Sequence, residues 1–375
     1  MRTNIKILFC SLVVFTLVTS CKTPSDALES TDYTLDVNFD DSYRSDLIEG
    51  YRYVRLETNE NCRLYDYNKI KVNDSYISFE AQDQLFLFNQ KGEFISKLSR
   101  KGRGKGEYIG ITDYEVTSNN IYILSWVQQA LLKYDMNGRF IDKYDLHEYY
   151  ASFKIVDNTH VFLCSSRSNS SNKNFALYDL NKRSVVYSCD YFDRNEGVMF
   201  ASFNDFIFSK DSVCYVTHPF DYMVYKLTPN EFSPLYNLSF NTKNQLPTNY
   251  EEIPVFDLNE QMRNKDVVKA IQLVYETSNG CYFGYKLHDE YGDTSYLTRI
   301  YNDGTQKTIR LLMSDFDKQF PYLNQPLGLY HDELVSVMSP YGIVYFETHN
   351  DIDTFTSQGY TEEDNPIVFF HKLKQ

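Results

Sequence analysis

The chain has 375 residues and a formal net charge of −14, with 51 acidic and 37 basic side chains. This charge disfavours nucleic acid and anionic membrane surfaces as general partners, because both require a basic footprint on the protein. The 33 tyrosines and 27 phenylalanines suit the half-buried surfaces of β-sheets. The composition therefore predicts an acidic, all-β protein.

The first twenty-one residues have the layout of a bacterial lipoprotein signal. Arg2 and Lys6 precede an apolar run over residues 7–18, and Cys21 follows directly after Val-Thr-Ser. The run is shorter than the ~20 apolar residues that a membrane-spanning helix requires. The pattern predicts cleavage after residue 20 and lipid attachment to Cys21. Cleavage removes two basic residues and takes the formal net charge from −14 to −16.

The signal divides the chain into three expected parts. These are a signal peptide over residues 1–20, the lipidated cysteine with a polar tether over residues 21–45, and one domain over residues 46–375. Acyl chains on Cys21 would anchor the protein in a membrane of the cell envelope. Lys22, which follows the cysteine, favours the outer membrane under the sorting rule of enterobacteria. The protein could face either the periplasm or the cell surface.

Beyond Cys21, the expected mature chain has five further cysteines, at irregular spacings and without a CxxC pair. Cys164, Cys214 and Cys281 each belong to an apolar, strand-like run, and the other two are Cys62 and Cys189. An exported protein can form disulfides, but a thiol is also a small apolar group that suits a strand interior. The context favours buried thiols over a disulfide framework.

A repeated unit predicts the fold. Residues 85–95 (LFLFNQKGEFI) match residues 131–141 (LLKYDMNGRFI) at an offset of 46 residues, with Gly92 and Gly138 in register. Less complete copies, each preceded by another strand-like run, cover residues 176–185, 224–232, 298–306 and 367–373. A strand–turn–strand unit at this period is typical of β-propellers. The six copies predict a six-bladed β-propeller of four-stranded antiparallel blades.

The ends of the chain predict how the ring closes. Residues 51–56 alternate apolar and polar side chains just before the first copy, and the last copy ends the chain. An N-terminal strand that completes the last blade would remove an open sheet edge. Residues 241–265 and 347–365 interrupt the period and are expected to be loop insertions.

Three motifs make the chain resemble the six-bladed β-propeller lipoproteins of Bacteroides and related bacteria. SDLI at residues 45–48 and VRLET at residues 54–58 precede the first repeat, and GRGKGEY at residues 102–108 follows it. That family has a LET strand before blade one and a GxGPGEY loop after it, and here Lys105 replaces the usual proline. The resemblance covers nearly the whole mature chain, including a long insertion between blades four and five. It implies a propeller distantly similar to NHL-repeat proteins and assigns no activity.

Residues 100–108 place four basic side chains and three glycines in one short loop. Nucleotide binding is not predicted, because the glycine pattern does not lead into a helix. The loop is either a tight crossover between blades, in which glycines supply positive φ, or a cationic lip at the channel mouth. A tight crossover would explain the three glycines, and a cationic lip would explain the four basic side chains.

Ligands of propellers usually lie where loops between blades converge on the central channel. The candidate ligand-binding residues, taken from the crossovers expected to lead into blades two, three and six, are Arg103, Lys105, Glu107, Tyr108, His147, Tyr149, Tyr150, Tyr330 and His331. They would offer cations to a carboxylate, aromatic faces to a sugar, and an imidazole that titrates near neutral pH.

Two classes of function remain open. One is a non-catalytic binding or scaffold module for a glycan, a peptide or an envelope protein. The other is an enzyme, a lyase or hydrolase, that acts on a carbohydrate or peptide in the funnel of the propeller. No metal or cofactor is predicted, because nothing has the ligand spacing of a known metal site and no nucleotide-binding motif occurs. No catalytic triad is predicted either, because the GxSxG motif is absent. Titratable side chains that converge at the funnel mouth would favour the enzyme, and aromatic and cationic groups without a paired acid and base would favour binding.

Overall fold

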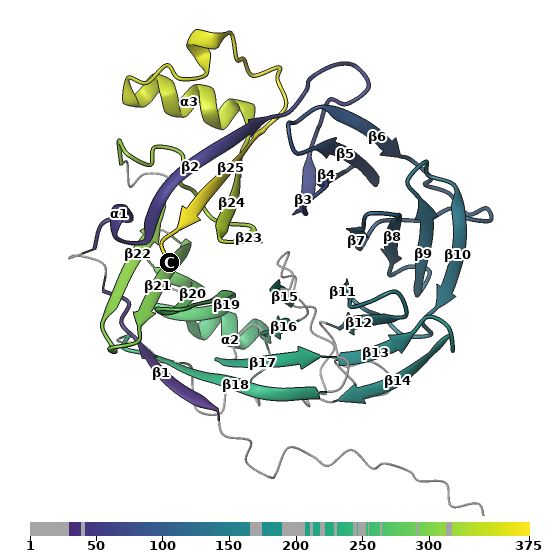
Figure 1. Cartoon of the computed structure of the whole chain (residues 1–375), viewed down its shortest axis with the longest axis horizontal. Helices are drawn as coiled ribbons and strands as arrows, with labels where there is room; N and C mark the ends of the chain where they lie inside the picture. The colour runs from purple at the N-terminus through teal and green to yellow at the C-terminus, as the bar shows by residue number, and fades with distance from the viewer. Residues whose placement is uncertain are drawn as a thin grey trace, which may run out of the picture.

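The computed structural model is a six-bladed β-propeller, seen along its axis in Figure 1. It describes residues 30–38, 42–165, 175–189, 207–210, 213–217, 222–228, 231–242, 246, 253, 255–262, 265–289, 292–312 and 317–375. Six sheets of four antiparallel strands surround the axis, and one of them carries a fifth strand. The predicted fold and blade number are therefore confirmed. The expected signal peptide over residues 1–20 and Cys21 lie outside the described residues.

The strands of each blade are given in order from the innermost to the outermost. Blade one contains β3 (Tyr67–Val72), β4 (Tyr76–Ala81), β5 (Gln84–Asn89) and β6 (Phe94–Leu98). Blade two contains β7 (Asp113–Val116), β8 (Asn120–Ser125), β9 (Ala130–Asp135) and β10 (Phe140–Asp145). Blade three contains β11 (Ser152–Ile155), β12 (His160–Cys164), β13 (Phe175–Asp179) and β14 (Ser184–Cys189).

The other three blades include the strands that close the ring. Blade four contains β15 (Ile207–Lys210), β16 (Val213–Val216), β17 (Met223–Thr228), β18 (Glu231–Phe240) and the added β1 (Thr31–Leu35). Blade five contains β19 (Val267–Thr277), β20 (Gly280–Asp289), β21 (Gly292–Tyr301) and β22 (Gln306–Leu311). Blade six contains β23 (Gly328–Tyr330), β24 (Glu333–Met338), β25 (Ile367–Leu373) and β2 (Ile48–Arg55).

Apolar layers between neighbouring blades form the core. Because side chains of a strand alternate between its two faces, one strand can serve two layers. In β5, Leu85 and Leu87 pack into the layer shared with blade two. Phe86 and Phe88 pack into the layer shared with blade six. Both faces are buried, which explains why the repeat copies read as nearly continuous apolar runs.

The glycines in register belong to equivalent turns. Gly92 and Gly138 adopt φ of +85° and +74°, and the N–H of each donates to the carbonyl three residues earlier, of Asn89 and Asp135. These turns join the third and fourth strands of blades one and two. A positive φ is a conformation that glycine adopts at little cost, so the repeat keeps glycine at this turn.

The predicted ring closure is confirmed. Strand β2 pairs antiparallel with β25, from Ile48 opposite Leu373 to Arg55 opposite Ile367. Leu56, at the end of this strand, is buried between blades six and one. The following Glu57 and Thr58 bind buried Asn365, whose side-chain amide donates to the Glu57 carbonyl at 2.6 Å and whose backbone N–H donates to Thr58 Oγ1 at 2.8 Å. The LET motif thus joins the last blade to the first.

The propeller begins earlier in the chain than residue 46, where it was expected to begin, because part of the expected tether forms a strand. Strand β1 pairs parallel with β18, from Thr31 opposite Tyr236 to Leu35 opposite Phe240. Leu35 is fully buried in the layer between blades four and five. A parallel pairing between segments 205 residues apart leaves no local sequence signature.

Helix α1 (Arg44–Leu47) connects this segment to blade six. The guanidinium of buried Arg44 donates to the carbonyls of Leu312, Phe320 and Leu323 at 3.0–3.4 Å. Residues 31–38 and 42–55 therefore form a belt around blades four, five and six (Figure 1).

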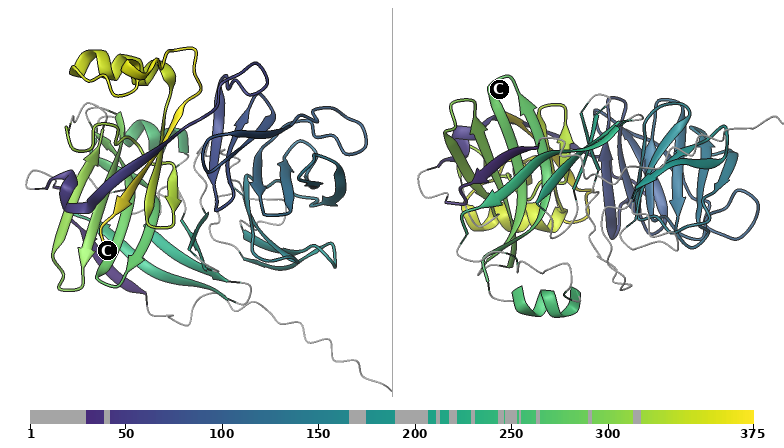
Figure 2. Two further views of the ribbon diagram at one scale, coloured as in Figure 1. Left: turned by 45° about the horizontal axis from the view of Figure 1, so that its top comes forward. Right: turned by 90° about the horizontal axis from the view of Figure 1, so that it is seen from below.

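Both expected insertions contain helices rather than only loops. Helix α2 (Val255–Met262) lies in the insertion before blade five and projects from one face of the ring (Figure 2). Helix α3 (Pro340–Asn350) and the 3₁₀ helix η2 (Thr356–Gln358) lie between β24 and β25. Ser339 caps α3 by accepting from the Gly342 N–H, and buried Phe346 and Phe355 pack in a separate apolar cluster. The polar composition of residues 347–365 concealed this cluster.

Four cysteines in the described part of the chain are buried thiols: Cys62, Cys164, Cys214 and Cys281. The prediction of buried thiols is confirmed for these four, and the Cys189 side chain lies outside the described part. Burial raises the pKa of the Cys214 thiol to about 11, so this group stays protonated at neutral pH.

Candidate functional site

A cavity of about 900 Å³ occupies the central channel. It is bounded by the innermost strands β3, β7, β11, β19 and β23 and by the turns that follow β3 and β23. Its walls differ in character. The side formed by blades one to three carries charged groups, and the side formed by blades five and six is mainly apolar and aromatic.

The charged wall is a network that links three successive blades. Lys69 and Lys71 of blade one reach Asp113 of blade two, with Nζ to Oδ1 distances of 3.4 and 2.8 Å. Lys154 Nζ of blade three lies 2.7 Å from Glu115 Oε1. Lys69 and Lys71 are two residues apart on β3, and Asp113 and Glu115 are two residues apart on β7. The two side chains of each strand therefore lie on the same face.

Backbone hydrogen bonds fix both carboxylates of this network, of which Glu115 lines the cavity and Asp113 is fully buried behind it. The Phe153 N–H donates to Asp113 Oδ2 at 3.1 Å, and the Ile155 N–H donates to Glu115 Oε2 at 2.8 Å. Burial would raise the pKa of Asp113, but Lys69 and Lys71 outweigh it and hold the pKa below its usual range. Burial would lower the pKa of Lys154, but Glu115 outweighs it and raises the pKa. Both groups therefore keep their charge at neutral pH.

The opposite wall offers apolar and aromatic contacts. Its lining residues from blades five and six include Val274, Tyr275, Leu327, Leu329, Tyr330 and Val335. The C-terminal residue Gln375 lies at the same mouth, where its side-chain amide donates to Tyr275 Oη and Asp332 Oδ2, each at 3.2 Å. This wall can pack against a carbon skeleton while the other wall meets a charge.

Tyr330 and His331 lie at one mouth of this channel. They form the end of β23 and its turn into β24, whereas the sequence pattern placed them in the crossover into blade six. His331 Nε2 lies 2.8 Å from Asp74 Oδ1, which belongs to the equivalent turn of blade one. Burial raises the pKa of Tyr330, and the Asp74 carboxylate adds to the shift.

The glycine-rich loop is an ordered crossover from blade one to blade two. Tyr108 is fully buried, and its hydroxyl donates to the Asp83 carbonyl at 2.9 Å. Gly106 adopts a φ of +75°, and a Cβ there would lie 2.5 Å from the Phe140 ring. Glu107 Oε2 accepts from the Gly104 N–H at 2.8 Å. These contacts account for the glycines by local geometry.

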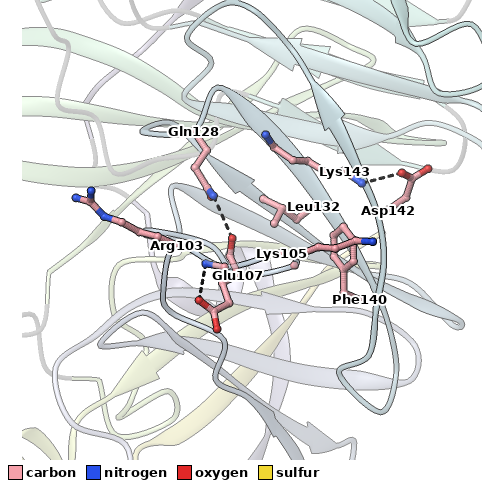
Figure 3. A pocket seen from close by; sticks show the side chains of 10 residues that line it. Arg103, Lys105, Glu107, Gln128, Leu132, Phe140, Asp142 and Lys143 are labelled. Carbon is pink, nitrogen blue, oxygen red and sulfur yellow. Dashed lines mark hydrogen bonds between the residues drawn. The ribbon is translucent and has the colours of Figure 1, made fainter.

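Arg103, Lys105 and Glu107 line a second, separate hollow of about 470 Å³, shown in Figure 3. Its other walls are Gln128 and residues of the outer strands β9 and β10, including Phe140 and Lys143. None of these side chains lines the channel cavity. The basic loop is therefore not a lip of the described channel.

The crossover into blade three also has both exposed and buried candidate residues. His147 is exposed with a φ of +61°. Half-exposed Tyr149 packs edge-on against Trp126, with 5.8 Å between the ring centroids. Tyr150 is buried in the layer between blades two and three, where burial raises its pKa to about 12 and Glu148 adds to the shift. Tyr108 and Tyr150 therefore cannot offer a ring face to a ligand.

The candidate ligand-binding residues lie at opposite ends of the innermost strands. Each innermost strand begins after a crossover from the preceding blade and ends at the first turn of its own blade. The innermost strands of neighbouring blades contact each other in register. Asp113 meets Phe153 and Glu115 meets Ile155. The crossovers with Arg103 and His147 are thus at the starting ends, and Tyr330 and His331 are at the finishing ends. The charged wall between them was missed, although the alternating KIK, DYE and SFK segments carry it.

A further charged group lies in blade five, where one carboxylate meets an imidazole and a lysine. His288 Nδ1 lies 2.6 Å from Asp293 Oδ1, and Lys269 Nζ lies 2.9 Å from the same oxygen. Among the described residues, no three His, Cys, Asp or Glu side chains come together as a metal site would require. In that same part of the chain, no helix has the length and apolar character needed to cross a membrane.

The solved structures that share the fold include two from Bacteroides species. A Bacteroides fragilis protein that its name describes as exported has a TM-score of 0.68 and 18% identity, over 92% of this chain and 100% of that one. A DUF4221 family member from Bacteroides vulgatus has a TM-score of 0.53 and 10% identity, over 88% of this chain and 97% of that one. These identities show the fold alone.

No functionally curated protein is significantly similar to the chain. The sequence profile of DUF4934, a domain of unknown function, matches residues 33–372. That span begins within β1 and ends within β25, so it covers the whole propeller. The chain therefore belongs to the DUF4934 family.

Proposed function

We propose that this protein is a cell-envelope lipoprotein whose propeller binds a small ligand, such as a short glycan or peptide, in its central channel. The observation that carries this proposal is the channel cavity of about 900 Å³, with one charged and one apolar wall. Cavities of roughly 300–1,000 Å³ with a few convergent polar groups are typical of small-molecule sites. A folded protein partner could contact the mouth but not fill this cavity.

The charge state of the wall supports binding rather than acid–base catalysis. A general acid or base works best when its pKa is near the operating pH. The pKa of buried Asp113 is held low by Lys69 and Lys71 against the effect of burial. The pKa of Lys154 is raised by Glu115 against the effect of burial. Groups fixed in their charged forms suit the recognition of a charged ligand.

Blocking the channel tests this function. Leu327 lines the cavity and is 55% exposed, so Leu327→Trp adds volume at the mouth without disturbing the core. In a thermal-shift screen of short oligosaccharides and peptides, compounds that stabilise the parent protein should lose their effect on Leu327→Trp. Ile95→Trp, at an outer-strand position of similar exposure, is the control and should respond like the parent. Compounds that stabilise all three proteins equally would place binding outside the channel.

The envelope location rests on the N-terminal signal and agrees with the similarity to a protein described as exported. Cys21 is ten residues before Thr31, where β1 begins. A fully extended chain of that length spans about 35 Å, so lipidation would keep the propeller close to the membrane.

Acyl labelling tests the anchor. Cells that express the full-length chain with radiolabelled palmitate should yield labelled protein in the membrane fraction. Cys21→Ala should be unlabelled, because the thiol is the acceptor of the lipid. Cys10→Ala, within the signal, is the matched control and should label normally. Labelling that persists in Cys21→Ala would contradict lipidation at this residue.

A further inference from the structure

We propose that the crossover side of blade two is a second binding surface, separate from the channel, and that it docks an acidic peptide segment of a partner protein. The surface consists of the hollow of about 470 Å³ beside the glycine-rich loop and of an exposed apolar patch next to it. Acidic side chains of the segment pair with Arg103 and Lys105, and an apolar side chain packs on Val127 and Tyr149.

Three of the five charged side chains that line the hollow already have partners. Glu107 Oε2 accepts from a backbone N–H of its own loop at 2.8 Å. Asp142 Oδ2 lies 2.5 Å from Arg183 Nη2, and its Oδ1 accepts from the Lys143 N–H at 2.8 Å. Lys143 Nζ lies 2.7 Å from Asp145 Oδ1. Both carboxylates of the hollow are therefore engaged within the protein.

The other two charged side chains of the hollow are cations. Arg103 and Lys105 are both exposed, and neither forms an ion pair within the part of the chain that the structure describes. Lys101 of the same loop differs, because it pairs with Asp83. The crossover geometry explains the glycines of this loop but not the two unpaired charges, which an acidic partner neutralises.

Arg103 and Lys105 suit two separate acidic groups rather than one carboxylate, because their side chains extend from the loop in different directions (Figure 3). The loop itself is fixed. Tyr108 is fully buried, and a Cβ at Gly106 would lie 2.5 Å from the Phe140 ring. A surface that is fixed before binding loses little conformational entropy when it meets its partner.

An exposed apolar patch lies beside the hollow. Val127 is 64% exposed, and the half-exposed Tyr149 ring packs edge-on against Trp126. Trp126 and Val127 belong to the turn between β8 and β9, and the same turn supplies Gln128 to the wall of the hollow. The cations and the apolar patch are therefore neighbours.

Hydrogen bonds fix the patch relative to the hollow. Gln128 Nε2 donates to the Glu107 carbonyl at 3.0 Å, which ties the turn to the basic loop. The Leu146 N–H donates to the Gln129 carbonyl at 2.8 Å, which ties the turn to the crossover that carries Tyr149. The loop, the turn and the crossover thus present their side chains as one surface.

This combination of side chains favours a peptide over a glycan. Arginine, tyrosine and tryptophan are enriched where proteins bind one another, and complementary charge steers the encounter. The edge-on packing of Tyr149 and Trp126 covers a ring face that a sugar would need for stacking. Exposed Val127 offers an aliphatic contact that suits an apolar side chain of a peptide. None of the residues that line this hollow lines the channel, so the two sites are separate.

Fluorescence anisotropy with three labelled anionic polymers tests the proposal on the full-length protein. The polymers are a random copolymer of glutamate and tyrosine, polyglutamate, and polygalacturonate. The copolymer should bind most tightly, because it alone combines peptide carboxylates with apolar side chains. Its binding should weaken as the salt concentration rises from about 50 mM to about 500 mM, because the two cations are exposed to screening.

The double variant Arg103→Gln with Lys105→Gln should bind the copolymer about tenfold more weakly, as expected for the loss of two exposed ion pairs. Lys91→Gln with Arg139→Gln is the matched control. It also removes one lysine and one arginine, both exposed, from the equivalent turns between the third and fourth strands of blades one and two. The control should bind like the parent.

Val127→Ser tests the apolar half of the surface. It should remove the advantage of the copolymer over polyglutamate and leave polyglutamate binding unchanged. Ile95→Ser, on the outer strand β6, is the control and should keep that advantage. An unchanged advantage in Val127→Ser would contradict the placement of the apolar side chain on this residue.

Each outcome decides the proposal. Copolymer binding that weakens in Arg103→Gln with Lys105→Gln and persists in the control pair supports it. Equal weakening in both pairs would assign binding to the net charge of the protein and overturn it. Tighter binding of polygalacturonate than of the copolymer would assign the surface to an acidic glycan and also overturn it. Copolymer binding that Leu327→Trp blocks would place the peptide in the channel. Absence of binding by all three polymers would overturn this proposal and leave the channel function intact.

Discussion

A chain that begins at Thr58 will lose cooperative unfolding, whereas a chain that begins at Thr31 will unfold like the full-length protein. The shorter chain lacks β2 and the buried side chains of Leu47, Ile48, Val54 and Leu56. Burial of each such side chain contributes roughly 1.5–3 kcal/mol. Their combined loss is comparable to the whole stability of a typical domain, roughly 5–15 kcal/mol, and it also opens the edge of β25.

A third chain separates ring closure from the rest of the belt. A chain that begins at Ser42 keeps β2 but lacks β1 and the fully buried Leu35. It should unfold cooperatively with a stability lower by about 2–3 kcal/mol, the contribution of that side chain and its edge strand. Circular dichroism melting curves of the three chains give the comparison. Equal melting temperatures for the chains from Thr31 and Thr58 would show that β2 does not close the ring.

Acid should destabilise the closing blade through His371. This side chain is fully buried in β25, with ring-centroid distances of 5.7 Å to Tyr51 and 6.2 Å to Phe369. Burial lowers its pKa to about 3, and the positive charge of Arg44 acts in the same direction. The folded-state pKa thus lies below the value of about 6.5 in the unfolded chain. The stabilisation is complete above pH 6.5 and is lost as the pH falls from 6.5 toward 3.

The magnitude can be measured by denaturant unfolding at pH 7.5 and pH 5.0. Each pH unit below 6.5 removes about 1.4 kcal/mol, so the free energy of unfolding should fall by about 2 kcal/mol through this residue. His371→Phe keeps an aromatic ring and cannot bind a proton, so its decrease should be smaller by that amount. His349→Phe, at an exposed position of α3, should behave like the parent. The same decrease in all three proteins would exclude His371 as the source.

Much of the fold could be predicted because its signals are local. The strand–turn–strand copies, with Gly92 and Gly138 in register, lie within single hairpins whose turn geometry requires glycine. Ring closure was predictable because a strand before the first repeat has no partner except the incomplete last blade. Helix α3 was missed because its apolar cluster is assembled from Tyr322, Phe346 and Phe355, which are scattered among polar residues.

The candidate site was only partly predictable. Tyr330 and His331 line the channel as expected, but Tyr108 and Tyr150 are buried between blades. Aromatic residues in glycine-rich or polar crossovers can point either outward or into a neighbouring blade, and the choice depends on how the blades pack. The basic residues Arg103 and Lys105 were identifiable by their charge, yet the loop directs them to a separate hollow.

The sequence by itself determined the blade number and the closure strand, because each is encoded in consecutive residues. Only the tertiary structure decided which residues meet in the channel. Lys71, Glu115 and Lys154 line the cavity and are each about one repeat apart, and they come together because the innermost strands of successive blades run side by side around one axis. Their alternation marks a shared face on each strand, but the partner across that face depends on the register between blades. That register is set by the apolar layers between blades, which involve residues distant in the sequence.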